Sequence, residues 1–294
     1  MMKKTWAVVG MVLLAALLVL PGPASSEMYV EGYLGGVGVD KDSINRSHGP
    51  FDLGDGVTLT LNGNFPGRFD NPFFTGGMKL GLWFDRTGIT GGYNWPDWMK
   101  YFGFYIDLSY HNLDYRKQNG TLTETLRYPG GGPESGTTPM TFSSNGRMFT
   151  LAFMFAARYG FLPDSEVPMG RLQPYVAVGP ALFVSSQSPS QTIFIPPLTD
   201  GDEMAAVILQ PARQGRLISV PGYKTKTSVD LGLAVDAGVR YYALKNVSID
   251  VFFKYRWVEP EYNYGFSLDG VHFDTSLKPT LHMFSGNVGV AYHF

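Results

Sequence analysis

The sequence predicts an all-β fold, an eight-stranded antiparallel transmembrane β-barrel with long outer loops. The first observation is that segments of about 10 to 14 residues alternate between apolar and small or polar side chains, which is the period of a β-strand. The second is that these segments number eight, an even number, as closed antiparallel barrels usually require. The third is that the connections between them alternate between long and short.

The composition does not contradict a membrane protein of this kind. The chain has 294 residues, 44% of them hydrophobic and 16% charged, and its mean hydropathy is -0.04. A value near zero is expected when apolar and polar residues alternate along strands that face lipid on one side only. The chain has no cysteine, so disulfides and thiolate metal sites are excluded. The net charge of -2 gives no support for nucleic-acid binding, and we expect no metal and no cofactor.

Residues 1–26 have the pattern of a cleaved signal peptide. Lys3 and Lys4 precede a short apolar run over 6–20, and small residues lead to an expected cleavage after Ser26. The run is shorter than the roughly 20 residues of a membrane-spanning helix. We therefore expect an exported protein whose barrel domain covers 27–294.

The eight expected strands account for most of the alternation in the mature chain. They cover 28–39, 74–85, 101–113, 148–159, 172–185, 228–242, 247–258 and 284–294. If the first strand runs outward from the periplasm, the long connections 40–73, 116–146, 187–226 and 259–280 face outside. The shorter connections 86–99, 160–171 and 243–246 then face the periplasm, which is the usual arrangement in outer-membrane barrels.

The polar face of the strands carries charges of both signs among glycine and alanine, which is typical of a narrow barrel interior. The predicted lumen charge network consists of Glu31, Lys79, Asp85, Asp107, Arg158, Asp230, Asp236, Arg240, Asp250, Lys254 and Arg256. Aromatic residues near strand ends predict interfacial girdles: Tyr29, Trp95, Trp98, Tyr159, Tyr241, Trp257 and Tyr292. The alternative is an exported soluble β-sandwich, which would bury its apolar face against a second sheet.

The interior of an eight-stranded barrel is just wide enough for side chains to fill it. The inward acidic and basic residues nearly balance in number, and unpaired charges in such a space are costly. We therefore expect paired charges and a lumen plugged by side chains. An open pore is not expected.

The last strand carries the most specific motif. The polar residue Asn287 is followed two positions on by Gly289, and the aromatic residues Tyr292 and Phe294 then occupy alternate places, with Phe294 as the last residue. In this motif, and over 27–294, the chain resembles small OmpA-like bacterial outer-membrane β-barrels. The stretch LQPYVAVGPAL at 172–182 also looks like the fifth strand of that family.

The resemblance implies a bacterial outer-membrane location and partners. The C-terminal strand would be the assembly signal read by the barrel-assembly machinery, and the barrel would contact outer-membrane lipid and lipopolysaccharide. We expect no peptidoglycan-binding domain after the barrel, so the resemblance does not imply tethering to the cell wall. We expect a monomer.

One set of residues suggests catalysis, but its spacing argues against it. Asp107, Ser109 and His111 share one face of a strand, and carboxylate, hydroxyl and imidazole together suggest a hydrolytic set. Residues i and i+2 lie about 6.6–7 Å apart along a strand, too far for a simple nucleophile–base hydrogen bond. We therefore predict that the protein is not an enzyme but a barrel with a structural or surface-binding role.

Two alternatives remain from sequence. One is a small channel or carrier for hydrophobic solutes, and the other is a lipid-modifying enzyme. The connection 187–226 is unusually apolar, with a possible short helix, and its role is open.

Overall fold

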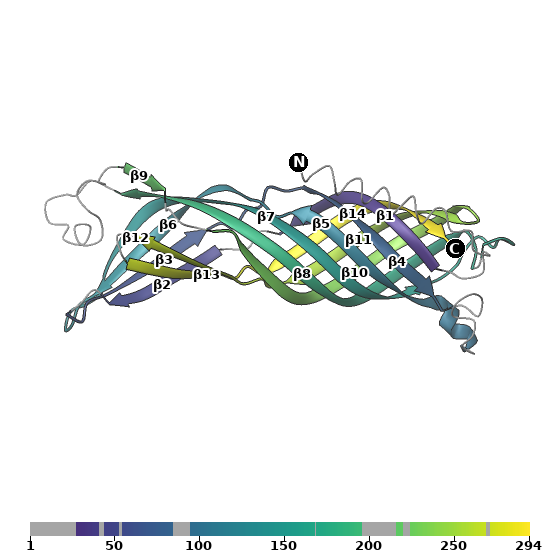
Figure 1. Cartoon of the computed structure of the whole chain (residues 1–294), viewed down its shortest axis with the longest axis horizontal. Coiled ribbons are helices and arrows are strands. Elements are labelled where there is room, and N and C mark those ends of the chain that lie inside the picture. Colours follow the sequence, from purple (N-terminus) through teal and green to yellow (C-terminus); the bar gives the residue numbers. More distant parts are fainter. Residues whose placement is uncertain are drawn as a thin grey trace.

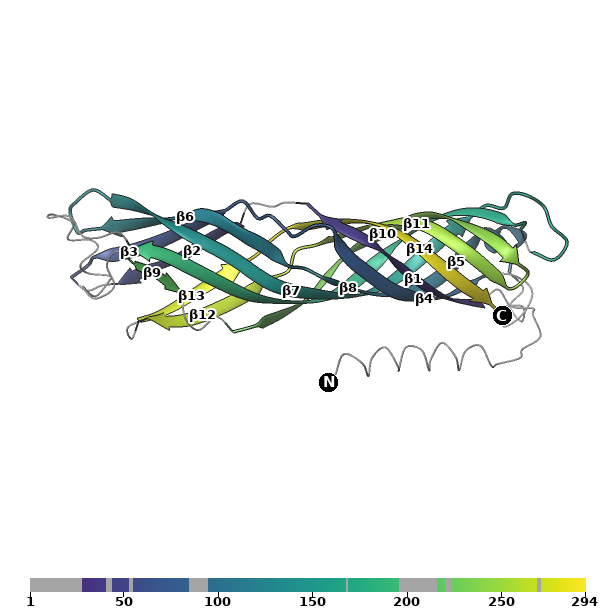
Figure 2. The same cartoon turned by 90° about the horizontal axis from the view of Figure 1, so that it is seen from above.

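The computed structural model describes residues 28–40, 44–52, 55–84, 95–167, 169–195, 216–219, 224–268 and 271–294. The expected signal peptide, Asp85 and most of 196–223 lie outside these residues. The molecule is elongated, with a barrel in one half and additional strands beyond it in the other (Figures 1 and 2). No described helix is long and apolar enough to cross a membrane.

Eight antiparallel strands close the barrel, as predicted. They are β1 (Met28–Val39), β4 (Phe73–Trp83), β5 (Phe102–Asn112), β7 (Glu134–Arg158), β8 (Leu172–Ile195), β10 (Lys226–Leu244), β11 (Val247–Val258) and β14 (Leu281–His293). Their hydrogen-bonded order is β1-β4-β5-β7-β8-β10-β11-β14, and β14 pairs back onto β1. All eight predicted segments are therefore strands of one closed barrel.

The connections predicted as outer loops contain further strands. These are β2 (Ile44–Asp52), β3 (Thr58–Phe65), β6 (Tyr115–Arg127), β9 (Arg216–Ser219) and the hairpin β12 (Tyr262–Leu268) with β13 (Val271–Leu277). With the long upper parts of β7 and β8 they form the distal half of the molecule (Figure 1). The sequence reading missed them because many are rich in Ser, Thr, Gln and Asn and lack the apolar alternation of the barrel strands.

The outward face of β7 changes chemistry along its 25 residues. In the barrel half Phe149, Phe153 and Phe155 face outward, and Phe155 is 63% exposed. In the distal half the outward positions from Thr137 to Arg147 are polar, apart from one proline. Because a lipid-facing surface must be apolar and a water-facing surface need not be, the membrane boundary falls between Arg147 and Phe149.

The interior changes in the opposite sense. The distal half encloses buried aromatic and aliphatic residues, with the rings of Phe65 and Phe142 5.0 Å apart and Phe69 stacked on Tyr115 at 4.2 Å. The barrel half encloses charged and polar groups. The distal half thus packs like a water-soluble β-structure, whereas the barrel half has the inverted polarity of a protein in lipid.

The opposite end of the barrel has the short connections and the C-terminus. A short 3-10 helix, η2 (Asp97–Tyr101), precedes β5 there. Trp98 is exposed, and Tyr101 stacks on the exposed Tyr159 with ring centroids 6.0 Å apart. These exposed rings at the strand ends have the placement of an interfacial girdle.

Candidate functional site: the ion-paired lumen

Strand alternation places one set of side chains inside the barrel and the other outside. The outward residues include Leu231, which is 76% exposed, and Phe253, which is 70% exposed. The inward residues of the same strands, such as Asp236 and Asp250, are fully buried. Eight charged groups gather inside in two layers, which we call the inner quartet and the outer quartet.

The inner quartet lies nearer the short connections and consists of Glu31, Lys79, Arg240 and Asp250. Strand register brings the members together in pairs, because Glu31 is opposite Lys79 and Arg240 is opposite Asp250. The Lys79 ammonium lies 2.9 Å from Glu31 Oε1 and 3.6 Å from Asp250 Oδ2. The Arg240 guanidinium lies 2.7 Å from Glu31 Oε2 and 3.2 Å from Asp250 Oδ2. Each base therefore contacts both acids.

The outer quartet consists of Asp107, Asp236, Lys254 and Arg256. Lys254 Nζ lies 2.6 Å from Asp107 Oδ2, and Arg256 Nη2 lies 2.9 Å from the same oxygen. Arg256 Nη1 reaches Asp236 Oδ1 at 2.6 Å. This quartet also has two acids and two bases, so both layers are electrically neutral.

Tyrosines add hydrogen bonds to three of the four acids. Tyr33 donates to Asp107 Oδ1 at 2.6 Å, Tyr105 donates to Asp236 Oδ2 at 2.7 Å, and Tyr175 donates to Asp250 Oδ2 at 2.9 Å. The sequence analysis did not include these tyrosines in the lumen network, although Tyr33 and Tyr105 share the strand parity of Glu31 and Asp107. Tyr175 shares the inward parity of Gln173 on β8, a strand without charged residues. That shared parity was the available signal.

Aromatic rings also surround the bases. Lys79 Nζ lies 3.2 Å from the ring centroid of Phe252, and the Arg240 guanidinium lies 4.1 Å from that of Tyr29. Such contacts are favourable because a cation is attracted to the ring face. The prediction of Tyr29 as a girdle residue was wrong, because its position in β1 shares the inward parity of Glu31 and its side chain is buried.

The remaining residues of the predicted network lie outside the two quartets. Arg158 donates to Gln173 Oε1 at 3.0 Å, and its guanidinium lies 4.1 Å from the ring centroid of Trp83. Asp230 is half-buried on β10 and belongs to neither quartet. Asp85 lies outside the described residues.

The structure does not bring Asp107, Ser109 and His111 together as a catalytic set. The Asp107 carboxylate is bound by Lys254, Arg256 and Tyr33 from other strands. His111 Nδ1 lies 2.7 Å from the carbonyl oxygen of Asn112, on its own strand. The carboxylate of Asp107 and the imidazole of His111 thus have other partners. Asp107, Ser109 and His111 also lie two positions apart along one strand, a spacing too long for a simple nucleophile–base hydrogen bond. Among the described residues no group of three or more His, Asp or Glu side chains could hold a metal ion.

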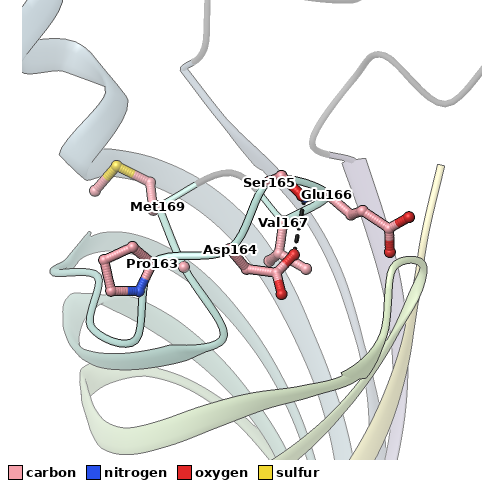
Figure 3. Close-up of a pocket in the computed structure, with 7 residues that line it drawn as sticks. Pro163, Asp164, Ser165, Glu166, Val167 and Met169 are labelled. Atoms are coloured by element: carbon pink, nitrogen blue, oxygen red, sulfur yellow. Dashed lines mark hydrogen bonds between the residues drawn. The ribbon is translucent and has the colours of Figure 1, made fainter.

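A concave region of about 430 Å³ lies in the turn between β7 and β8 (Figure 3). Asp164 organises this turn, because Oδ1 accepts from the Glu166 amide at 2.8 Å and Oδ2 accepts from Arg171 Nε at 2.6 Å. The Arg171 hydrogen bond lowers the pKa of the Asp164 carboxyl below its usual value. The region is formed by a single turn, and these hydrogen bonds join residues within and directly after that turn.

The closed barrel, its outward apolar belt and its ion-paired interior define an integral outer-membrane β-barrel of the small eight-stranded class. The protein lies in a bacterial outer membrane. The end with the short connections is the one that the sequence predicts to face the periplasm, and the distal half, which we also call the external half, is the one predicted to lie outside.

Comparison with solved structures gives matches of low sequence identity. Neisserial surface protein A is 12% identical, with a TM-score of 0.36, over 92% of this chain and 100% of that chain. OprG from Pseudomonas aeruginosa is 12% identical, with a TM-score of 0.42, over 93% and 99%. Ail of Yersinia pestis is 12% identical, with a TM-score of 0.30, over 91% and 99%. No protein-family model and no curated protein matches the sequence.

Proposed function

We propose that the protein is a non-conducting outer-membrane barrel that holds a rigid external β-structure at the cell surface, where that structure binds its partners. The observation that carries the proposal is the pair of neutral ion quartets across the membrane-level lumen. Each quartet is buried and linked by tyrosines to several strands. Such a network resists the entry of water and ions.

Electrostatics supports a closed lumen. Removing a charge from water is expensive, and a buried charge is tolerated when it is paired and hydrogen-bonded. Opening a continuous water path would require the breaking of several contacts of 2.6–2.9 Å at once. Because each quartet has two acids and two bases, the quartets themselves carry no net charge that would attract counterions.

The external half supports a surface-binding role. β7 and β8 continue from the barrel into the external half without interruption, over 25 and 24 residues. Their buried aromatic contacts, such as Phe65 with Phe142, give this half its own packed interior. Packed β-structure keeps exposed side chains in fixed positions, which lowers the entropic cost of binding.

A liposome-swelling assay tests the proposal. Purified protein reconstituted in liposomes is expected to leave the permeability to small sugars and amino acids at the level of protein-free liposomes. Swelling at rates comparable with an open porin in the same assay would overturn the closed-lumen proposal.

A second candidate function, a carrier for hydrophobic solutes, is favoured by one observation. The interior of the external half is lined by apolar residues such as Phe69, Tyr115 and Phe142. A carrier would accelerate entry of an apolar fluorescent dye into cells that make the protein while leaving sugar-driven swelling unchanged. Equal dye entry with and without the protein would remove this candidate.

We also propose that the last strand is the signal for assembly. β14 pairs with β1 on one side and β11 on the other, and the Phe294 amide donates to the Met28 carbonyl at 3.0 Å. Asn287 and Gly289 face inward, and Tyr292 and Phe294 form an edge-to-face pair at 5.2 Å. A terminal strand that completes the seam is a suitable place for recognition by the barrel-assembly machinery. Assembly as a monomer is part of the same proposal.

A further inference from the structure

The outer boundary of the apolar belt is not uniform around the barrel. On β5 and β7 the last outward apolar residues are Tyr110 and Phe149, which are directly opposite each other in the register. The next outward pair is Asn112 and Arg147, which are also opposite and exposed. Arg147 therefore stands immediately above exposed aromatic rings, at the level where lipid headgroups begin.

A β-bulge adds two cations beside Arg147. The pairing of β6 with β7 goes from Tyr115 opposite Ser144 to Gln118 opposite Phe142, so β6 has one extra residue. Strict alternation would send one of two successive residues inward, but the bulge leaves both Arg116 and Lys117 exposed. The two side chains are thus on the outer surface a few residues above the belt.

A fourth cation reaches the same surface from the segment before β4. Arg68 is exposed, and its carbonyl accepts the Arg116 amide at 3.0 Å. The neighbouring Phe69 bridges to Tyr115 and points inward. We call the surface of Arg68, Arg116, Lys117 and Arg147 the basic rim. The acidic Asp70 also lies on it and contacts Arg116 at 3.4 Å, with both side chains exposed.

The opposite side of the barrel has a different charge. There β11 is followed by exposed Glu259 and Glu261, and Glu261 pairs with Lys278 at 2.9 Å. β11 is four strands away from β5 in the closed order, which is as far as an eight-stranded barrel allows. Among the described residues, four exposed cations therefore gather over β5, β6 and β7, and two further exposed cations, Lys224 and Lys226, lie just before and at the start of β10.

We propose that the basic rim binds the phosphoryl groups of an outer-leaflet glycolipid. The basic rim lies directly above the exposed rings of Tyr110 and Phe149, and this position favours a lipid as the ligand. A lipid with phosphates on its headgroup would place its acyl chains on these rings and its phosphates among the cations. Arginine suits phosphate because its planar guanidinium can donate two parallel hydrogen bonds. Basic side chains at a membrane surface also gain from the anionic surface potential.

The test measures binding of purified glycolipid to the folded barrel in detergent by native mass spectrometry. The probes are bisphosphorylated lipid A, the same lipid without phosphates, and inorganic pyrophosphate as a soluble anion. The rim variant carries Arg116→Gln, Lys117→Gln and Arg147→Gln. A matched control carries Arg127→Gln, Lys245→Gln and Lys278→Gln, which remove the same charge from exposed positions away from the rim.

The rim variant is expected to bind bisphosphorylated lipid A on the order of 100-fold more weakly, from about 1 kcal/mol for each lost cation. The matched control is expected to change affinity by less than about threefold. The wild-type protein should bind the dephosphorylated lipid about as weakly as the rim variant binds the phosphorylated one. Asp70→Asn should strengthen binding, since it removes the acid beside Arg116.

Three outcomes would overturn the proposal. One is equal affinity of the rim variant and the wild type for lipid A, and another is an equal loss in the matched control. The third is pyrophosphate binding as tight as that of the lipid and equally dependent on the rim, which would identify a site for soluble polyanions. Heat-modifiable migration on a gel verifies that each variant is folded, and Asp70→Asn tests the proposal even if the rim variant does not fold.

Discussion

Lys254 and Asp107 lie 147 positions apart in the sequence, yet their charged atoms meet at 2.6 Å in the barrel interior. Arg256 and Tyr33 reach the same carboxylate from two different strands. Asp107 therefore joins β5 to β1 and β11 across the lumen. Because Asp107 contacts two bases of the outer quartet, its loss should affect the stability of the whole quartet.

Asp107→Asn should destabilise the folded barrel by about 3–5 kcal/mol, because it leaves Lys254 and Arg256 buried with an incomplete set of partners. Urea unfolding in lipid vesicles, followed by the heat-modifiable gel shift, measures the free energy of unfolding. The control is Asp70→Asn, which removes an acid from an exposed pair and should change stability by about 0–1 kcal/mol. Equal effects of the two substitutions would show that the outer quartet does not stabilise the barrel.

Gly179→Ala should impair folding of the barrel. A Cβ atom at this position of β8 would fall on the carbonyl oxygen of Phe153 in β7, and backbone cannot move aside as a flexible side chain can. The expected loss is about 1–3 kcal/mol or more. Gly32→Ala in β1 is the control, because a Cβ there meets nothing within 4 Å. Equal yields of folded protein from both variants would contradict the close approach of β7 and β8.

Acid should loosen the turn between β7 and β8 that Asp164 organises. Its folded-state pKa is lowered, so its contribution is present above the unfolded value of about 3.9 and is lost as pH falls through the folded value. Hydrogen exchange at the Glu166 amide, corrected for intrinsic rates, should therefore become less protected at low pH. Asp164→Asn should show the loss already at neutral pH, and unchanged protection in that variant would refute the role of this carboxylate.

Deletion of Phe294 should reduce the amount of assembled protein in the outer membrane. The deletion removes the terminal ring and the amide that donates to Met28 across the closing seam. The control, Phe294→Tyr, keeps both the amide and an aromatic ring and should assemble normally. Quantitative immunoblots of the heat-modifiable form measure the effect, and normal assembly of the deletion would remove Phe294 from the proposed signal.

The barrel strands could be predicted from the sequence because lipid on one side and packed side chains on the other impose a strict alternation. Around 247–258, for example, Phe253 and Tyr255 alternate with Lys254 and Arg256, and β11 covers the same residues. The strands of the external half follow a weaker rule. A strand face that contacts water can carry Ser, Thr and Gln as well as other residues. Strands such as β6 therefore resemble loops in composition and could not be recognised from the sequence.

The pairing inside the lumen could be predicted only in kind. Balanced inward charges indicate that partners exist, but Arg240 and Glu31 are 209 positions apart in the sequence. They meet because only β14 and β11 separate β1 from β10 in the closed order. Tyr29 shows the opposite difficulty. An aromatic residue near a strand end can lie in the lipid-facing girdle or in the barrel interior. Tyr29 lies in the interior because it shares the inward parity of Glu31.

Planar-bilayer conductance tests the central claim, a lumen closed by two neutral ion quartets, most directly. Purified, folded protein is reconstituted at low density, and current is recorded over a range of voltages in a salt solution in which a general porin serves as the positive control. We expect membranes without large, stable current steps. A steady porin-sized current from the folded protein would contradict this expectation.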